Sequence, residues 1–149
     1  MYGGRTDYAV DDKGRVSLPS ALRETLEQQQ YDRVWVTNNY FWGEPFLAVY
    51  SPREWERTVG RIRQRPSFDP EIQLFQFFFI GGAQEAVLDR QGRVLIAQRL
   101  RTFAKLEREV TFSAMADGFQ LWNREIVEKL LTTARERFSD PEFQRKLGI

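Results

Sequence analysis

The side chains in this sequence best suited to bind a ligand are the lysines and arginines that flank two glycines. One group surrounds Gly14 and the other surrounds Gly92. Arginine offers paired donors that match phosphate groups and guanine edges, and a glycine beside it lets the protein backbone approach a duplex closely. We therefore predict that these cations bind double-stranded DNA. The predicted DNA-binding residues are Lys13, Arg15, Arg90 and Arg93.

The same residues also allow a purely local interpretation. Both groups belong to the pattern Asp-x-x-Gly-Arg, in which Asp11 or Asp89 can bond the turn backbone and pair with the following arginine. Gly14 and Gly92 then stand where a tight turn needs a positive φ. On this interpretation the pattern is a solvated turn. Its recurrence with Gly-Arg-Val intact favours a role beyond the turn itself.

Composition excludes several kinds of site. Lysine and arginine number 22 against 21 acidic residues, so DNA binding must come from local placement of cations rather than from net charge. Cysteine and histidine are absent, which excludes disulfides, thiolate or imidazole metal sites, and Ser-His or Cys-His catalysis. We expect no enzymatic activity, cofactor or metal. A carboxylate-dependent hydrolase is the remaining enzymatic alternative, without a paired acid motif to support it.

The sequence shows no targeting or membrane signal. It contains no apolar run of ~18 residues and no charged-then-apolar start of the kind that a signal peptide has. We therefore expect a cytoplasmic protein.

An internal repeat organises the chain. The segment Asp11 to Val16 matches Asp89 to Val94 at an offset of 78 residues, and a Leu-Arg pair follows at the same offset in both copies. We assign residues 1–80 to a first module and 81–149 to a second, connected at Gly81-Gly82. Neither copy looks able to bury its apolar face alone, so we expect one pseudo-twofold body built from both.

Each copy predicts an α+β unit with a mainly β core. The Asp-x-x-Gly-Arg turn joins two strands into a β-hairpin with a basic tip, and a short helix starting at Pro19 follows. Residues 34–36 and 46–49 predict two further strands joined by a loop from Asn38 to Pro45. Ser51 begins a capping box for an amphipathic helix. In the second copy Asn123 caps the corresponding helix.

Other arginines have weaker claims to a DNA contact. Arg23 and Arg101 end the Leu-Arg pairs, and we favour a structural role in which they lock the short helix to the turn through a carboxylate such as Asp11 or Asp89. A second set recurs every four residues along one helix and is typical of a solvated face. This set is Arg53, Arg57, Arg61 and Arg65.

The run of phenylalanines from Phe75 to Phe79 is typical of a core or a subunit interface. A stacking platform for single-stranded nucleic acid is the alternative. We favour burial, because consecutive phenylalanines cannot all be solvated in a protein that stays soluble.

Over essentially its whole length the sequence resembles the MraZ family of bacterial regulators. The family pattern is an Asp-x-Lys-Gly-Arg-x-x-x-Pro segment, then Gly-Ala before a second Asp-x-x-Gly-Arg with Leu-Arg, and later a tryptophan. The residues that carry the resemblance are Asp11, Lys13, Gly14, Arg15, Pro19, Gly82, Ala83, Asp89, Gly92, Arg93, Leu100, Arg101 and Trp122.

The resemblance implies a fold and a function. The fold is two tandem swapped-hairpin SpoVT-AbrB-like modules that form a β-barrel body with peripheral helices. The implied function is repression of the division and cell-wall gene cluster. The protein would assemble into a homo-oligomeric ring, associate with the nucleoid and bind direct repeats in the promoter. The alternative function, from a different functional class, is a protein-binding or assembly module that does not bind DNA.

The second copy departs from the family pattern. Ala97 replaces a proline, Lys105 replaces a frequent glycine, and Ser113 to Met115 replace a Val-Gly turn. These changes question how firmly the second helix start is held, while Arg93 stays in place.

Overall fold

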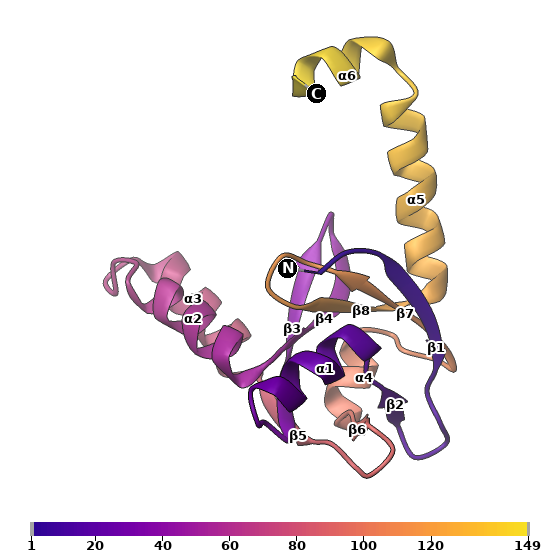
Figure 1. Ribbon diagram of the computed structural model, residues 1–149. Helices are drawn as coiled ribbons and strands as arrows, with labels where there is room; N and C mark the ends of the chain where they lie inside the picture. Colours follow the sequence, from indigo (N-terminus) through magenta and orange to yellow (C-terminus); the bar gives the residue numbers. More distant parts are fainter. Residues whose placement is uncertain (1, 149) are drawn as a thin grey trace.

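Residues 2–148 are described by a computed structural model, and they form eight strands and six helices (Figure 1). The strands are β1 (Arg5–Ala9), β2 (Arg15–Ser17), β3 (Arg33–Phe41), β4 (Glu44–Tyr50), β5 (Gln84–Val87), β6 (Arg93–Leu95), β7 (Glu109–Ala114) and β8 (Phe119–Asn123). The helices are α1 (Ser20–Gln28), α2 (Pro52–Arg63), α3 (Pro70–Phe79), α4 (Gln98–Phe103), α5 (Arg124–Phe138) and α6 (Pro141–Leu147).

The two copies exchange strands in the sheet, although β3 and β4 pair within the first copy and β7 and β8 within the second. The order of the main sheet is β1-β7-β8-β4-β3-β5, so β1 of the first copy pairs with β7 of the second, and β5 of the second pairs with β3 of the first. A separate ribbon joins β2 to β6, again across copies. The predicted hairpin within one copy is therefore wrong, because the strands on either side of each turn pair with the other copy.

This exchange gives the body a pseudo-twofold pattern of strands. The β4–β8 pair lies at the centre of the sheet and the β2–β6 pair is its counterpart in the ribbon, which contacts both sheet edges, β1 and β5. In the described residues β1 and β5 do not pair with each other, so strand pairing does not close the predicted barrel.

Side chains of the central strands alternate between two cores. Val34 and Val36 of β3 face the core beneath α1, α4 and the ribbon, whereas Trp35 faces the core beneath α2, α3 and α5. This is the two-residue period expected of a strand with both faces covered. Both cores draw residues from both copies, which explains why neither copy buries its apolar face alone.

The starts of α1, α2 and α5 lie within one residue of the positions that the sequence predicts. Pro19 is the N-cap of α1 rather than its first helical residue. The Ser51 Oγ accepts the Glu54 amide N–H at 3.3 Å at the start of α2, and Asn123 Oδ1 accepts two amide N–H groups at the start of α5. These caps satisfy donors that have no partner inside the helix.

The predicted loop from Asn38 to Pro45 is wrong. β3 continues to Phe41 and β4 begins at Glu44, with only Trp42 and Gly43 between them. Both turn residues have positive φ, 54° and 74°, as a two-residue type I′ turn requires. Pairing with β4 extends the strand through residues whose own preferences favour a loop.

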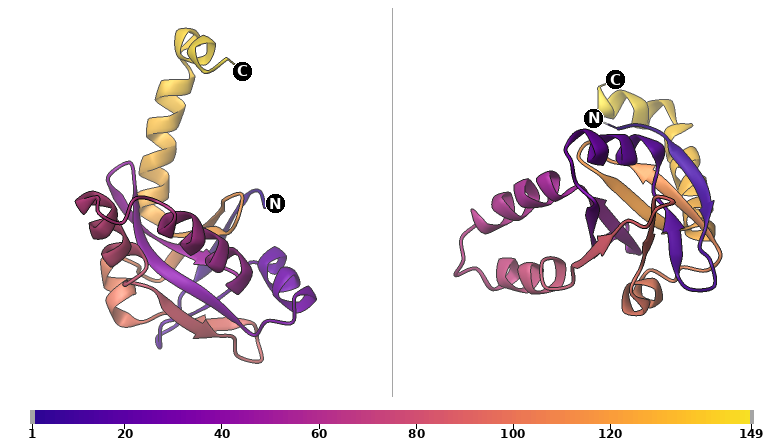
Figure 2. Two further views of the ribbon diagram at one scale, coloured as in Figure 1. Left: turned by 90° about the vertical axis from the view of Figure 1, so that its left-hand side faces the viewer. Right: turned by 60° about the horizontal axis from the view of Figure 1, so that its bottom comes forward.

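The pair of helices that ends the first copy, α2 and α3, differs in shape from the pair that ends the second, α5 and α6 (Figure 2). α2 and α3 lie side by side and contact β3, so that Phe79 is buried. α5 instead projects from the sheet and α6 folds across its far end, where Phe138 meets Phe143 edge to face at 5.1 Å. None of the described helices has the length and apolar character needed to cross a membrane.

Candidate nucleic-acid interface

The two Asp-x-x-Gly-Arg turns have nearly the same geometry. In the first, Asp11 Oδ1 accepts the amide N–H groups of Lys13 and Arg15, both at 2.9 Å. In the second, Asp89 Oδ1 accepts those of the equivalent residues, again at 2.9 Å. An aspartate that bonds the backbone two and four residues ahead fixes the turn locally. The aspartates thus shape the loops that carry the cations.

Each turn also depends on its glycine. Gly14 has φ of 89° and Gly92 has φ of 75°, a region that residues with a Cβ seldom adopt. The Gly14 carbonyl accepts the Ile96 amide at 3.0 Å, and the Gly92 carbonyl accepts the Leu18 amide at 3.2 Å. Each turn is therefore attached to the other copy, at one end of the β2–β6 ribbon.

The arginine of each turn pairs with the aspartate of the same turn. The Nε of Arg15 lies 2.7 Å from Asp11 Oδ2, and the Nε of Arg93 lies 2.9 Å from Asp89 Oδ2. Arg93 Nη1 also lies 3.7 Å from Asp11 Oδ2, so Asp11 links the two turns. The arginine side chains remain 33% and 28% exposed. Pairing inside the turn therefore orients both guanidinium groups without removing them from the surface.

These contacts set the charge of the aspartates. The hydrogen bond from the Arg15 amide, with help from its guanidinium, lowers the pKa of Asp11 from 3.8 to about 2. The Arg93 amide likewise lowers the pKa of Asp89. Both carboxylates are ionised at neutral pH, as the turn hydrogen bonds require.

Lys13 and Arg90 stand at the apices of the turns. Both side chains are exposed, and neither forms an ion pair with another residue in the described part of the chain. They are thus available to a ligand, whereas two of the cations on α2 are paired: Arg57 with Glu54 at 2.8 Å and Arg61 with Asp117 at 3.3 Å.

Arg23 and Arg101 connect the copies in a way that the sequence did not reveal. Arg101 donates from Nε to the Ile96 carbonyl at 3.0 Å, and its guanidinium covers Gly14 of the first turn. Arg23 donates to the Leu18 carbonyl at 3.1 Å and covers Gly92. The predicted carboxylate acceptors are wrong, because backbone carbonyls take their place. Each short helix is fixed to its own strand and covers the turn of the other copy.

The altered start of the second helix keeps its geometry. Ala97 has φ −55° and ψ 141°, almost the same as Pro19 at −54° and 141°. Its amide N–H, which proline would lack, donates to Gln84 Oε1 at 2.9 Å, and Gln84 donates to the Leu95 carbonyl at 2.8 Å. Gln84 thereby fixes the segment between β6 and α4, which a proline at position 97 would otherwise stiffen.

The phenylalanine run is divided between core and surface. Phe79 is buried, whereas Phe77 is 80% exposed and Leu74 beside it is also exposed. The expectation of burial therefore holds for only part of the run.

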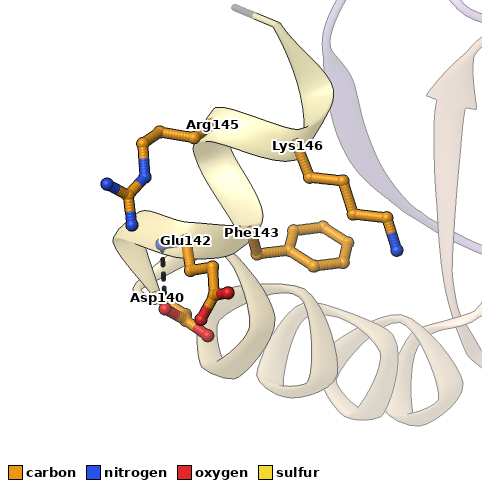
Figure 3. A pocket seen from close by; sticks show the side chains of 5 residues that line it. All are labelled: Asp140, Glu142, Phe143, Arg145 and Lys146. Carbon is orange, nitrogen blue, oxygen red and sulfur yellow. Dashed lines mark hydrogen bonds between the residues drawn. The ribbon is translucent and has the colours of Figure 1, made fainter.

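A hollow of about 580 Å³ lies on α6 and combines acidic and basic side chains (Figure 3). Asp140 is occupied as a cap, since its Oδ1 accepts the Glu142 amide at 3.0 Å. Within residues 2–148 no group of three acidic side chains is arranged to hold a metal ion. Among the described residues, the two turns therefore remain the candidate site.

Comparison with known proteins decides the family. The family model described as "MraZ protein, putative antitoxin-like" matches twice, at residues 1–78 and 79–148. The chain belongs to the MraZ family. Proteins named transcriptional regulator MraZ include one from Syntrophobacter fumaroxidans, 34% identical over 83% of this chain and 79% of its own length. Those from Solidesulfovibrio magneticus and Pseudomonas putida are 32% and 34% identical, over 93% and 84% of this chain and 90% and 82% of their own lengths.

Proposed function

We propose that this MraZ family member is a non-enzymatic regulator of transcription that binds double-stranded DNA through the apices of its two turns. The contacts are Lys13 and Arg15 in the module of residues 1–80, and Arg90 and Arg93 in that of residues 81–149. The observation that carries the proposal is the pair of equivalent turns, each with an exposed apical cation and an arginine oriented by its own aspartate.

The ribbon spacing supports contact with a single duplex. Gly14 lies opposite Ile96 and Gly92 lies opposite Leu18, so the turns are separated by four residues along the ribbon. Four strand residues span ~13 Å. The major groove of B-DNA is about 12 Å wide and admits a two-stranded β-ribbon. Both apices can therefore reach one groove and its flanking phosphates.

We further propose that the protein assembles with copies of itself. Phe77 and Leu74 on α3 are exposed, and Trp42 at the β3–β4 turn is 61% exposed. Large apolar side chains gathered on a surface are typical of interaction sites. Different patches on one chain favour head-to-tail contacts, which close into rings when the rotation allows. Several weak DNA contacts then add through effective concentration.

The remaining parts of the proposal follow from the family. The strand exchange is the swapped-hairpin arrangement of SpoVT-AbrB modules, and the protein acts in the cytoplasm at the nucleoid. It represses the division and cell-wall gene cluster by occupying direct repeats in the promoter. No cofactor takes part.

The DNA contact is tested by fluorescence anisotropy over a salt series. The probes are a duplex from upstream of the protein's own gene and a scrambled duplex of the same composition. We expect tighter binding to the natural duplex and a steep salt dependence, which an Arg15→Ala/Arg93→Ala variant loses because phosphate contacts release counterions. An Arg15→Lys/Arg93→Lys variant, which keeps the charge, serves as the matched control.

Thermal unfolding of each variant separates binding from folding. If natural and scrambled duplexes bind equally weakly, and the alanine variant binds like the parent while remaining folded, the regulator proposal fails. The protein would then be an interaction module that uses its exposed aromatic side chains.

Assembly has its own test. Phe77→Asp places a charge on the exposed face of α3 without touching the buried Phe79. We expect a smaller assembly in light scattering after size exclusion, with an unchanged circular dichroism spectrum. Phe77→Tyr keeps the aromatic surface and should assemble like the parent. An unchanged mass for Phe77→Asp would place the contact elsewhere.

A further inference from the structure

The two turns are a matched pair that differs in charge at the apex. Asp12 of the first turn and Arg90 of the second stand at equivalent positions, because the copies are offset by 78 residues. The aspartate at the start of each turn makes the same two backbone contacts, all at 2.9 Å. The backbone is therefore held constant while the apical side chain changes sign.

The local charges differ accordingly. The first turn, residues 11–15, contains two carboxylates and two cations, whereas the second, residues 89–93, contains one carboxylate and two cations. Each glycine is covered by one arginine from the other copy, so these contributions are equal. The second turn is the more positive of the two by one charge.

The Asp12 side chain is exposed. It forms no hydrogen bond or ion pair with other residues in the part of the chain that the structure describes, whereas Asp11 is engaged by Arg15 and Arg93. It does not shape the turn, because Asp11 already supplies the backbone contacts. Within residues 2–148 no side-chain contact accounts for an aspartate at this position.

A carboxylate at a DNA-facing apex is unfavourable on most sequences. It is repelled by phosphates at every site, but it can accept a hydrogen bond from the N4 amine of cytosine in the major groove. An element that penalises wrong partners more than the right one increases specificity. An apical arginine has the opposite effect, since it attracts phosphates on any sequence.

We propose that the turns have divided these tasks: Asp12 is a specificity-determining residue that weakens binding to non-target DNA, and Arg90 is a general phosphate contact. This inference depends on the proposed DNA-binding function. It assigns discrimination to the first module and sequence-independent affinity to the second, although their backbones are alike.

The test uses short duplexes with a single natural or scrambled site, titrated by anisotropy over a salt series. Asp12→Asn removes the charge and keeps the side-chain shape. We expect it to bind scrambled DNA about two- to fivefold more tightly, the range for one exposed charge pair, with little gain on natural DNA. Arg90→Gln should weaken binding to both duplexes and lower the salt slope by about 0.9.

Two controls separate local charge from net charge. Glu56→Gln removes an exposed carboxylate on α2 that forms no ion pair in the described part of the chain, and it should leave discrimination unchanged. The exchange variant Asp12→Arg/Arg90→Asp keeps the net charge. If the turns have different tasks, it should bind natural DNA more weakly than the parent and discriminate less.

The outcomes are distinct. Asp12→Asn that changes both duplexes by the same factor, or neither, overturns the assignment of Asp12, as does an exchange variant that behaves like the parent. A salt slope unchanged in Arg90→Gln overturns the assignment of Arg90. A parent protein that binds neither duplex in a salt-dependent way instead refutes the proposed function itself.

Discussion

Replacing Gly14 with alanine tests how the first turn is held by the other copy. At φ of 89° an alanine is strained, which costs about 1–2 kcal/mol. Its Cβ would lie 2.6 Å from Cζ of Arg101, so that side chain must move and give up its hydrogen bond to the Ile96 carbonyl, about 1 kcal/mol more. We expect Gly14→Ala to lower the free energy of unfolding by about 2–3 kcal/mol in urea, at a fixed protein concentration.

Gly4→Ala is the matched control. Gly4 has φ of 91°, but nothing lies within 4 Å of the position that an added methyl group would take, so the variant should lose only the backbone part, about 1–2 kcal/mol. In an Arg101→Ala background, Gly14→Ala should fall to the same cost, which gives a measurable coupling between the two residues. Equal losses for Gly4→Ala and Gly14→Ala, with no coupling to Arg101, would refute the reasoning.

Three further predictions concern local structure. Lys105→Gly should raise the free energy of unfolding in urea by about 0.5–1 kcal/mol, because Lys105 has φ of 56° after α4; a lower free energy would contradict it. Ala97→Pro should leave the free energy of unfolding nearly unchanged, since the gain in chain entropy offsets the lost hydrogen bond to Gln84. Gln84→Ala should then cost less stability in the Ala97→Pro variant than in the parent, and strictly additive losses would contradict this. The pKa of Asp11 is about 2 in the fold against 3.8 ordinarily, so its stabilisation is complete above about pH 5 and is lost as pH falls toward 2. Asp11→Asn should therefore lose less stability in acid than the parent, as measured by unfolding followed by circular dichroism.

Features that depend on neighbours in the sequence were predicted well. The hydrogen bonds of Asp11 and Asp89 inside their turns and the Ser51 and Asn123 caps all involve partners within a few residues. Such contacts form whenever the right residue types stand at the right spacing. The repeat itself was also visible, and it gave the equivalence of the two turns.

Features that depend on distant partners were missed. The turn at Trp42 and Gly43 was predicted as a longer loop, because only pairing with β4 extends β3 through Asn38. The carbonyl acceptors of Arg23 and Arg101 could not be found, since a backbone acceptor leaves no mark in the sequence.

The sequence by itself determined the chemistry of the candidate site. It showed that there are two turns, which residues form each turn, and which lysines and arginines each turn carries. Only the tertiary structure decided how the turns are joined. A strand of three residues such as β2 can pair with any neighbour that offers free backbone groups, and its side chains do not specify which. Burial of one core shared by both copies selects β6 as its partner, and so brings two turns from distant parts of the chain to the ends of one ribbon.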